Sequence, residues 1–370
     1  MRRKRVTLAD IAEAVGVSST TVSLVLSGRA RDLRISSDVQ SRVRAAAERM
    51  GYRRGAVSAG PRAGRPPIIG FVSDTVATSR LAGEMIKGAV EAARDLGFTL
   101  VLGETEGDAA LEHTLLRTLH QHHTAGVILA STRTRVVEVP EDLGATAAVL
   151  LNALPAQRSS LSSILPDEVE AGRAAARVLL EAGHRDGIHV IGAGPDPADV
   201  PDGAVAAVER LVGLHDEFDS AYVTVESARP CRSWLPESGF DATRDLLART
   251  RPRALVCLDD HLALGACQAL QHAGLRVPND VSVVSFGDHP VSSWIRPRLT
   301  TVALPYRELG VKAVEVLVGD LRRPTGEAPD QGTAHRVPMP VRLRDSVGPP
   351  DDGPRLVEPG ARRVVFGRAE

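Results

Sequence analysis

The stretch VTLADIAEAVGVSSTTVSLVLSGRA, residues 6–30, decides how the N-terminal part of this chain folds. Apolar residues recur at helical spacing over 8–15, and Thr7 is suited to cap the start of that helix. Gly16 ends the helix, and Ser18 caps a second helix that stops before the next glycine. Two short helices joined by a tight glycine turn form a helix-turn-helix.

A third amphipathic segment lies in RISSDVQSRVRAAAERMGY, residues 34–52. Its apolar side chains repeat every three or four residues from Ser37 to Met50, and Gly51 takes the position that commonly follows a helix. The sequence therefore predicts an all-α, three-helix domain over residues 1–53.

The charge of the chain is divided unevenly. Residues 1–65 carry 14 Lys and Arg against 5 Asp and Glu, whereas the rest of the chain carries 31 against 41. A compact basic segment joined to an acidic body is typical of a nucleic-acid-binding module attached to a domain with another partner. A solubilising basic tail is the alternative on charge alone.

Residues 6–30 and 34–52 together closely resemble the headpiece of the LacI/GalR family of bacterial transcriptional regulators. The resemblance implies a double-stranded, pseudo-palindromic DNA operator, with the second helix in the major groove. It makes Ser19, Thr20 and Leu24 candidate base readers, with helix capping or solvation as the alternative for each Ser or Thr. The further DNA-contact candidates that it implies are Thr7, Ser18, Thr21, Ser23, Ser27 and Tyr52.

Two departures from the family pattern affect this region. Leu24 stands where the family usually has Arg and cannot donate to guanine, so we expect a changed operator preference with DNA binding retained. In the linker, residues 54–67, Pro61 stands where the family has the Leu of a short hinge helix. Because proline lacks an N–H and clashes with the preceding turn, a continuous hinge helix is disfavoured there.

From Ile68 onward, short β-branched runs alternate with helical segments, which predicts parallel, doubly wound α/β sheets. The number of strands is better divided between two sheets than placed in one. We expect a two-lobed α/β domain over 68–347, with lobe 1 formed by 68–164 and 290–322, and lobe 2 by 165–289 and 323–347. The tail, 348–370, is rich in Pro, Gly and charge and is expected to be disordered.

The body resembles the sensor domain of the same family, which is similar to periplasmic sugar-binding proteins. LPDEVEAGRAAARVLLEAGHR, residues 165–185, and RPRLTTVALPYRELGVKAVEVL, residues 296–317, are among the matching segments. Ligands of such sheets bind at the carboxyl ends of strands, in the expected cleft between the lobes. The effector-binding residues that the resemblance implies are Asp74, Ser79, Arg80, Arg210, Trp234, Asp259 and Asp288.

These residue types suit a sugar-like ligand, because Arg and Asp pair with vicinal hydroxyls and Trp offers an apolar face. Ion pairing is the alternative for Asp74 and Arg210, loop packing is the alternative for Trp234, and Asp260 is either a helix cap or a ligand group. Gly287 replaces a frequent Asp of the family, Asp259 a common Asn and Arg80 a position that is often Pro. An acidic or phosphorylated ligand is therefore a further hypothesis.

The sequence predicts a sequence-specific DNA-binding transcriptional regulator, with repression as the expected action, whose operator affinity is modulated by a small molecule. A homodimer is expected, because two-fold protein symmetry imposes two-fold symmetry on an operator. The alternatives are a regulator whose cleft has lost its ligand and a solute-binding protein without a regulatory role.

No motif predicts an enzyme, a cofactor or a metal. IGAGPD, residues 191–196, lacks the third glycine of a dinucleotide fingerprint, and His120, His122 and His123 come without a matching Cys/His set. The longest apolar runs fall short of the roughly 20 residues of a membrane span. Three cysteines without a CxxC pair and a basic N-terminus without an apolar signal segment favour a cytoplasmic location.

Overall fold

The structure is a computed structural model that describes residues 8–26, 35–49, 67–79, 82–144, 146–194, 200, 203–323 and 332–350. Three of the predicted DNA contacts, Thr7, Ser27 and Tyr52, lie outside the described residues, and so do Arg80 and Pro61.

The N-terminal domain is the predicted helix-turn-helix with a third helix: α1 (Leu8–Val15), α2 (Ser19–Leu26) and α3 (Ser37–Arg49). Gly16 has a φ of +72°, a conformation that glycine adopts without steric cost. Arg42 of α3 donates through Nη2 to the carbonyl oxygen of Val15 at 2.7 Å, which satisfies the C-terminal end of α1. The buried core consists of Ile11, Ala12, Val15, Val22, Val25, Val43, Ala46 and Ala47.

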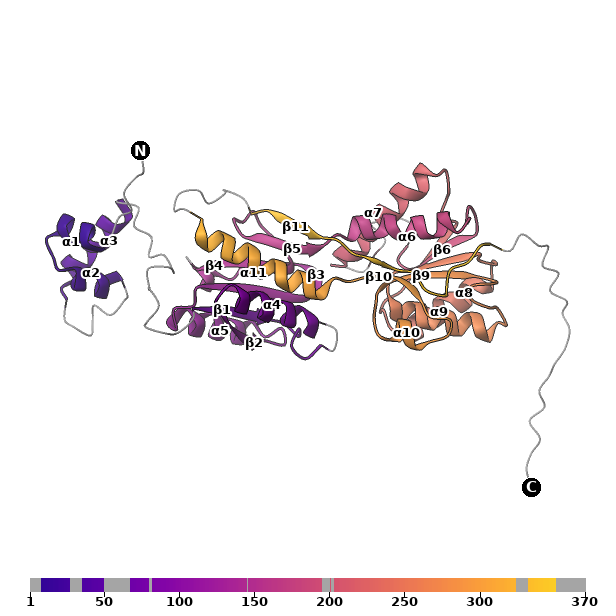
Figure 1. Ribbon diagram of the computed structural model, residues 1–370, viewed down its shortest axis with the longest axis horizontal. Coiled ribbons are helices and arrows are strands. Elements are labelled where there is room, and N and C mark those ends of the chain that lie inside the picture. The colour runs from indigo at the N-terminus through magenta and orange to yellow at the C-terminus, as the bar shows by residue number, and fades with distance from the viewer. Residues whose placement is uncertain are drawn as a thin grey trace, which may run out of the picture.

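The body contains two six-stranded sheets with helices on both faces, as expected for doubly wound α/β lobes (Figure 1). The first sheet has the order β11-β5-β4-β3-β1-β2, and all of its strands are parallel. Its strands are β1 (Ile68–Ser73), β2 (Thr99–Glu104), β3 (Gly126–Val137), β4 (Ala147–Pro155), β5 (Ser162–Pro166) and β11 (Ala334–Val337). Helices α4 (Gly83–Asp95) and α11 (Tyr306–Arg322) pack on one apolar cluster, and α5 (Ala109–Gln121) with η1 (Glu141–Leu143) packs on another. We call this unit lobe 1.

The second sheet has the order β12-β10-β9-β8-β6-β7, with only β12 antiparallel among its described pairs. Its strands are β6 (Ile188–Gly192), β7 (Ser227–Pro230), β8 (Ala254–Cys257), β9 (Ser282–Gly287), β10 (Thr300–Ala303) and β12 (Val341–Arg342). The helices are α6 (Glu168–Glu181), α7 (Val205–Ser220), α8 (Pro236–Leu247), α9 (Asp260–His272) and α10 (Val291–Trp294). This unit, with these helices, is lobe 2.

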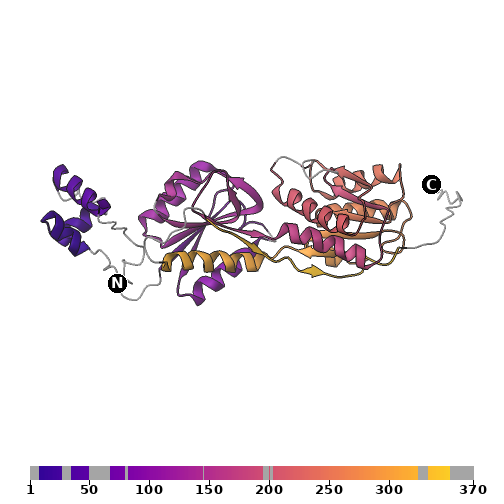
Figure 2. The same cartoon turned by 90° about the horizontal axis from the view of Figure 1, so that it is seen from above.

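The chain passes between the lobes at three places, after β5, β10 and β11 (Figure 2). The predicted division was wrong for two strands. Residues 300–303 form β10 beside β9 in lobe 2, and residues 334–337 form β11 beside β5 in lobe 1. Both strands are four residues long, and which neighbour a short parallel strand pairs with depends on distant residues that local patterning does not report.

The first residues of the predicted disordered tail are fixed on lobe 2. The backbone N–H of Gly348 donates to Ser282 Oγ at 3.1 Å, and the Gly348 carbonyl lies 3.0 Å from His184 Nε2. Residues 351–370 lie outside the described residues.

Three helix pairs, α4 with α11, α6 with α7 and α8 with α9, approach one another so closely that their contact points need glycine. An ideal Cβ at any of these contact points would lie 1.9–2.2 Å from a carbonyl oxygen of the facing helix, which is far inside contact distance. The six glycines are Gly88 and Gly310, Gly172 and Gly213, and Gly239 and Gly265.

The two glycines of α11 should respond oppositely to alanine. Gly310→Ala places a Cβ 1.9 Å from the Met85 carbonyl oxygen and should lower the free energy of unfolding by roughly 2 kcal/mol or more. Gly319→Ala meets no atom within 4 Å and should raise it by about 0.5–1 kcal/mol, since alanine is the better helix former. Urea titration followed by circular dichroism measures both, and equal effects would contradict the close packing.

Candidate functional site

The first turn of α2 carries two exposed hydroxyl groups. Ser19 and Thr20 are exposed, whereas Val22 and Val25 of the same helix are buried in the core. The helix therefore has one face fixed to the domain and presents its N-terminal hydroxyls outward.

Ser18 and Thr21 have a capping role in the structure. Ser18 Oγ accepts a hydrogen bond from the backbone N–H of Thr21 at 3.0 Å and lies 2.8 Å from its hydroxyl oxygen. This is the helix-cap alternative to direct DNA contact. Ser23 and Leu24 are half-buried.

In lobe 1, Asp74 follows the carboxyl end of β1 and is held by residues of the second half of β3. Asp74 Oδ1 accepts from the Thr132 hydroxyl at 2.7 Å and from its backbone N–H at 3.0 Å. Arg135 lies 3.5 Å from the other carboxylate oxygen. Ser79 Oγ accepts from the backbone N–H of Ala82 at 3.3 Å and so closes the turn before α4.

In lobe 2, Arg210 of α7 forms a buried ion pair with Glu168 at the start of α6. Arg210 Nε and Nη2 donate to the two Glu168 carboxylate oxygens at 2.6 and 2.9 Å, and Nη1 donates to the Leu258 carbonyl at 2.6 Å. The two side chains are only 4% and 1% exposed. Burial opposes the charged form, but the adjacent Glu168 carboxylate raises the pKa of Arg210 above its usual value.

Aromatic rings flank this arginine. The Arg210 guanidinium carbon lies 4.8 Å from the centre of the Phe286 ring and 5.9 Å from that of Trp234. The Trp234 indole N–H donates to the Gly192 carbonyl at 3.3 Å, which fixes the orientation of the ring.

Asp259 and Asp260 have different roles at the start of α9. Asp259 is the N-cap, because its Oδ1 accepts from the backbone N–H of His261 at 2.7 Å. Asp260 is fully buried and accepts hydrogen bonds from the Ser285 and Thr301 hydroxyls at 2.5 and 2.8 Å. The cap alternative considered for Asp260 therefore applies to Asp259 instead.

Two histidines lie beside these carboxylates. The rings of His261 and His289 are 4.5 Å apart, and the backbone N–H of His289 donates to Asp260 at 2.6 Å. The hydrogen bond to Asp259 raises the pKa of His261, whereas burial lowers the pKa of His289.

Asp288 is paired within lobe 2. One carboxylate oxygen accepts from Arg344, and the other lies 3.6 Å from Arg342. The neighbouring Gly287 has a φ of +129°, and a Cβ there would lie 3.2 Å from Asp260 Oδ2. Both the backbone conformation and the nearby carboxylate disfavour an Asp side chain at position 287 in this structure.

Three of these side chains, Arg210, Asp259 and Trp234, lie where the lobes meet, and Tyr306 interacts electrostatically with the first two. Tyr306 begins α11 of lobe 1, and its surroundings include Arg210 and Asp259 of lobe 2. Burial, with Asp259 nearby, raises the pKa of Tyr306 to about 12. Trp234 lies beside the same arginine, so the structure brings together three predicted effector residues, Arg210, Trp234 and Asp259. Asp74 and Ser79 lie on lobe 1.

The sequence interpretation missed Glu168, Tyr306 and Arg344. Glu168 and Tyr306 lie inside the two quoted matching segments, which was an available signal. Arg344 carried none, because its contact with Asp288 spans 56 residues of sequence.

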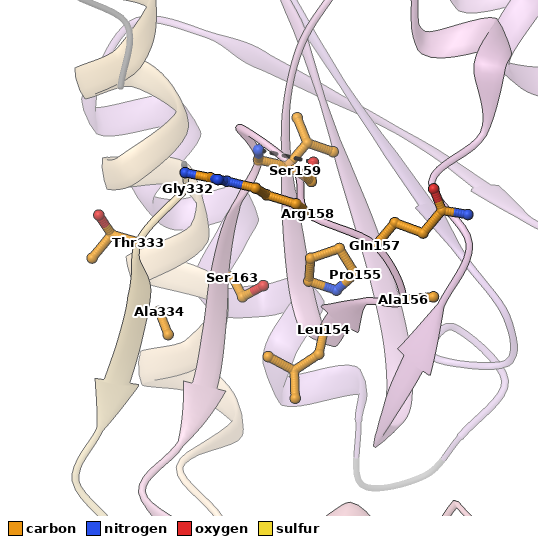
Figure 3. Close-up of a pocket in the computed structure, with 11 residues that line it drawn as sticks. Leu154, Pro155, Ala156, Gln157, Arg158, Ser159, Ser163, Gly332, Thr333 and Ala334 are labelled. Carbon is orange, nitrogen blue, oxygen red and sulfur yellow. Dashed lines mark hydrogen bonds between the residues drawn. The ribbon is translucent and has the colours of Figure 1, made fainter. Parts of the chain in front are cut away.

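A groove of about 370 Å³ lies elsewhere, in lobe 1, along the β4–β5 connection and the first residues of β11 (Figure 3). Its polar lining includes Arg158, Ser163 and Thr333, and Leu154 and Pro155 supply apolar surface. None of the predicted effector residues lines it. We place the candidate effector site by side-chain chemistry at the junction of the lobes.

The described residues contain no group of three His, Cys, Asp or Glu side chains arranged to hold a metal ion. Within the same part of the chain, no helix is long and apolar enough to cross a lipid bilayer.

Comparison with known proteins assigns both parts of the chain. Residues 7–55 match the family model of bacterial regulatory proteins of the lacI family, and residues 177–347 match a periplasmic binding protein-like domain. The ribose operon repressor of Escherichia coli (strain K12) is 29% identical over 323 residues, which cover 86% of this chain and 94% of that protein. The regulator DegA of Bacillus subtilis (strain 168) is 28% identical and covers 83% and 89%.

Solved structures agree with this assignment. A Lac repressor dimer bound to operator and an anti-inducer has a TM-score of 0.61 and 25% identity, covering 93% of this chain and all of that one. A complex of the transcriptional regulator CelR with cellobiose has a TM-score of 0.60 and 26% identity, covering 92% and 100%. These relatives are regulators, in agreement with the prediction that the chain is not an enzyme.

Asp260 should make stability depend on pH in an unusual direction. Burial raises its pKa to about 6 from 3.8, so the folded state keeps a proton that the unfolded chain releases. The resulting stabilisation is present below pH 4 and is lost as the pH rises through 6, on the order of 3 kcal/mol. Urea titrations from pH 4 to 7 should show this loss in the wild type and a flatter profile in Asp260→Asn. The exposed control Asp245→Asn should match the wild type; a wild-type slope in Asp260→Asn would contradict the assignment.

Proposed function

This chain belongs to the LacI family of bacterial regulatory proteins and is a DNA-binding transcriptional regulator, and we propose that it is a repressor controlled by a neutral, sugar-like effector. The observation that supports this most directly is the pairing of a lacI-type helix-turn-helix with a lobe junction whose charged side chains already have internal partners.

We place the DNA interface on the first turn of α2. Ser19 and Thr20 are exposed there, while Ser18 and Thr21 stabilise the helix start. A recognition helix of this class enters the major groove with its N-terminal residues facing base edges. Leu24 offers a methyl-bearing side chain to thymine where an arginine would read guanine, which should favour an A·T pair at the corresponding operator position.

The charges at the lobe junction favour a neutral effector. Arg210 is neutralised by Glu168, Asp74 lies beside Arg135, and Asp288 is paired with Arg344. An anionic ligand on Arg210 would have to displace Glu168 and leave a carboxylate buried without its partner, at several kcal/mol. Hydroxyl groups can use the remaining donor capacity of the guanidinium and leave the ion pair intact. We therefore set aside the acidic or phosphorylated ligand.

We propose that the protein acts as a homodimer, as the similar Lac repressor dimer does, on a pseudo-palindromic operator with one headpiece on each half-site. Effector binding between the lobes would change operator affinity by its differential affinity for two lobe arrangements. Such a repressor acts on chromosomal DNA in the cytoplasm.

Removal of the exposed hydroxyls should weaken specific DNA binding. Fluorescence anisotropy at fixed salt, with a labelled duplex from upstream of the chain's own coding region, should show binding tighter than to a scrambled duplex. Ser19→Ala combined with Thr20→Ala should cost roughly 1–3 kcal/mol of that preference, as for loss of base contacts. Ser41→Ala, an exposed residue of α3, is the matched control. If the double variant keeps the full preference, the interface lies elsewhere.

Effector class can be tested by isothermal titration with D-ribose, cellobiose and ribose 5-phosphate. We expect a neutral sugar to bind and the phosphorylated sugar to be rejected. Glu168→Gln frees Arg210 and should shift selectivity toward the phosphate, whereas Glu170→Gln, on the exposed side of α6, should not. Tighter binding of ribose 5-phosphate by the wild type would refute the neutral class, and absence of any binding would favour the ligand-independent alternative.

A further inference from the structure

Two consecutive residues of α7 hold different parts of the molecule. Arg210 binds Glu168 within lobe 2, as described above. Glu209 accepts two hydrogen bonds from Arg336 of β11, which belongs to lobe 1, with Nη1 to Oε2 and Nη2 to Oε1 both at 2.6 Å. The helix that carries the candidate effector arginine is therefore also attached to the other lobe.

Arg336 connects a circuit of contacts that runs from β11 through the first crossing segment to α7. Its Nη1 also donates to the carbonyl oxygen of Pro166 at 3.1 Å, and Pro166 is the last residue of β5 before the chain crosses to lobe 2. Two residues later lies Glu168, the partner of Arg210. The circuit thus joins β11, the first crossing segment and α7 through four charged side chains.

The two ion pairs of this circuit differ in exposure. The Glu168 and Arg210 side chains are 1% and 4% exposed, whereas those of Glu209 and Arg336 are 17% and 33% exposed. Bidentate pairing of a planar guanidinium with a carboxylate restricts both position and orientation. A displacement of α7 at Arg210 cannot leave the Glu209 to Arg336 contact unchanged, because the two residues are adjacent in one rigid helix.

We infer that Glu209 and Arg336 are positioning residues that couple the effector site at Arg210 to lobe 1. The inference rests on the proposed function, since it gives the route by which that site would be regulated. An effector that reorients Arg210 shifts this turn of α7, and the bridge carries the shift to β11. Coupling between sites is reciprocal, so a substitution of Arg336 must also change the surroundings of Arg210 at the effector site.

This reciprocity gives a test that needs neither effector nor operator. The chain has two tryptophans, and Trp294→Phe leaves Trp234, beside Arg210, as the only one. In that background of the full chain, Arg336→Gln, Glu209→Gln and the double variant are compared by tryptophan emission and acrylamide quenching. Arg323→Gln, which breaks the pair with Asp320 at the end of α11, is the matched control in lobe 1.

Coupling predicts that Arg336→Gln, a change in lobe 1, alters the quenching constant of Trp234 by roughly twofold. The double variant should show no more than either single variant, because both remove the same bridge. Arg323→Gln should leave the signal unchanged. If Arg336→Gln leaves the quenching constant of Trp234 unchanged, with or without a loss of thermal stability, the ion pair has only a structural role and the inference is overturned. Neither result bears on DNA binding, which the anisotropy experiment tests separately.

Discussion

The buried ion pair between Glu168 and Arg210 is the constraint on which the arrangement of lobe 2 and its candidate site depends. Two charges removed from water must satisfy each other, and loss of one leaves the other uncompensated at a cost of several kcal/mol. The same guanidinium donates to the Leu258 carbonyl, one residue before the Asp259 cap of α9. One side chain therefore fixes α6, α7 and the start of α9 relative to one another, and all three border the site.

Close helix packing is what makes this ion pair possible. A Cβ at Gly172 of α6 would lie 2.1 Å from the carbonyl oxygen of Arg210, and a Cβ at Gly213 of α7 would lie 1.9 Å from that of Val169. The two glycines therefore adjoin the backbone next to the charged pair itself. A larger residue at either position would separate the helices and lengthen the ion pair, so the small residues serve the electrostatics as well as the packing.

The sequence predicted what depends on local pattern and missed what depends on distant pairing. Helical periodicity and glycine stops located the three headpiece helices, and alternating strands and helices located both α/β lobes. Strands β10 and β11 were assigned to the wrong lobes, because their neighbours are chosen by hydrogen bonds to segments that only the fold brings near. For the same reason Arg210 could be selected from its motif, but its pairing with Glu168, 42 residues away, could not be predicted.

The three crossing segments lie beside the proposed effector site. Asp167 N donates to the Val337 carbonyl, and Ala303 N donates to the Pro340 carbonyl, so the three crossings are hydrogen-bonded to one another. Any rotation of one lobe against the other must turn these segments together, and Glu168 directly follows the first of them. A ligand that binds Arg210, as proposed, would therefore act on the ion pair that directly follows the first crossing segment.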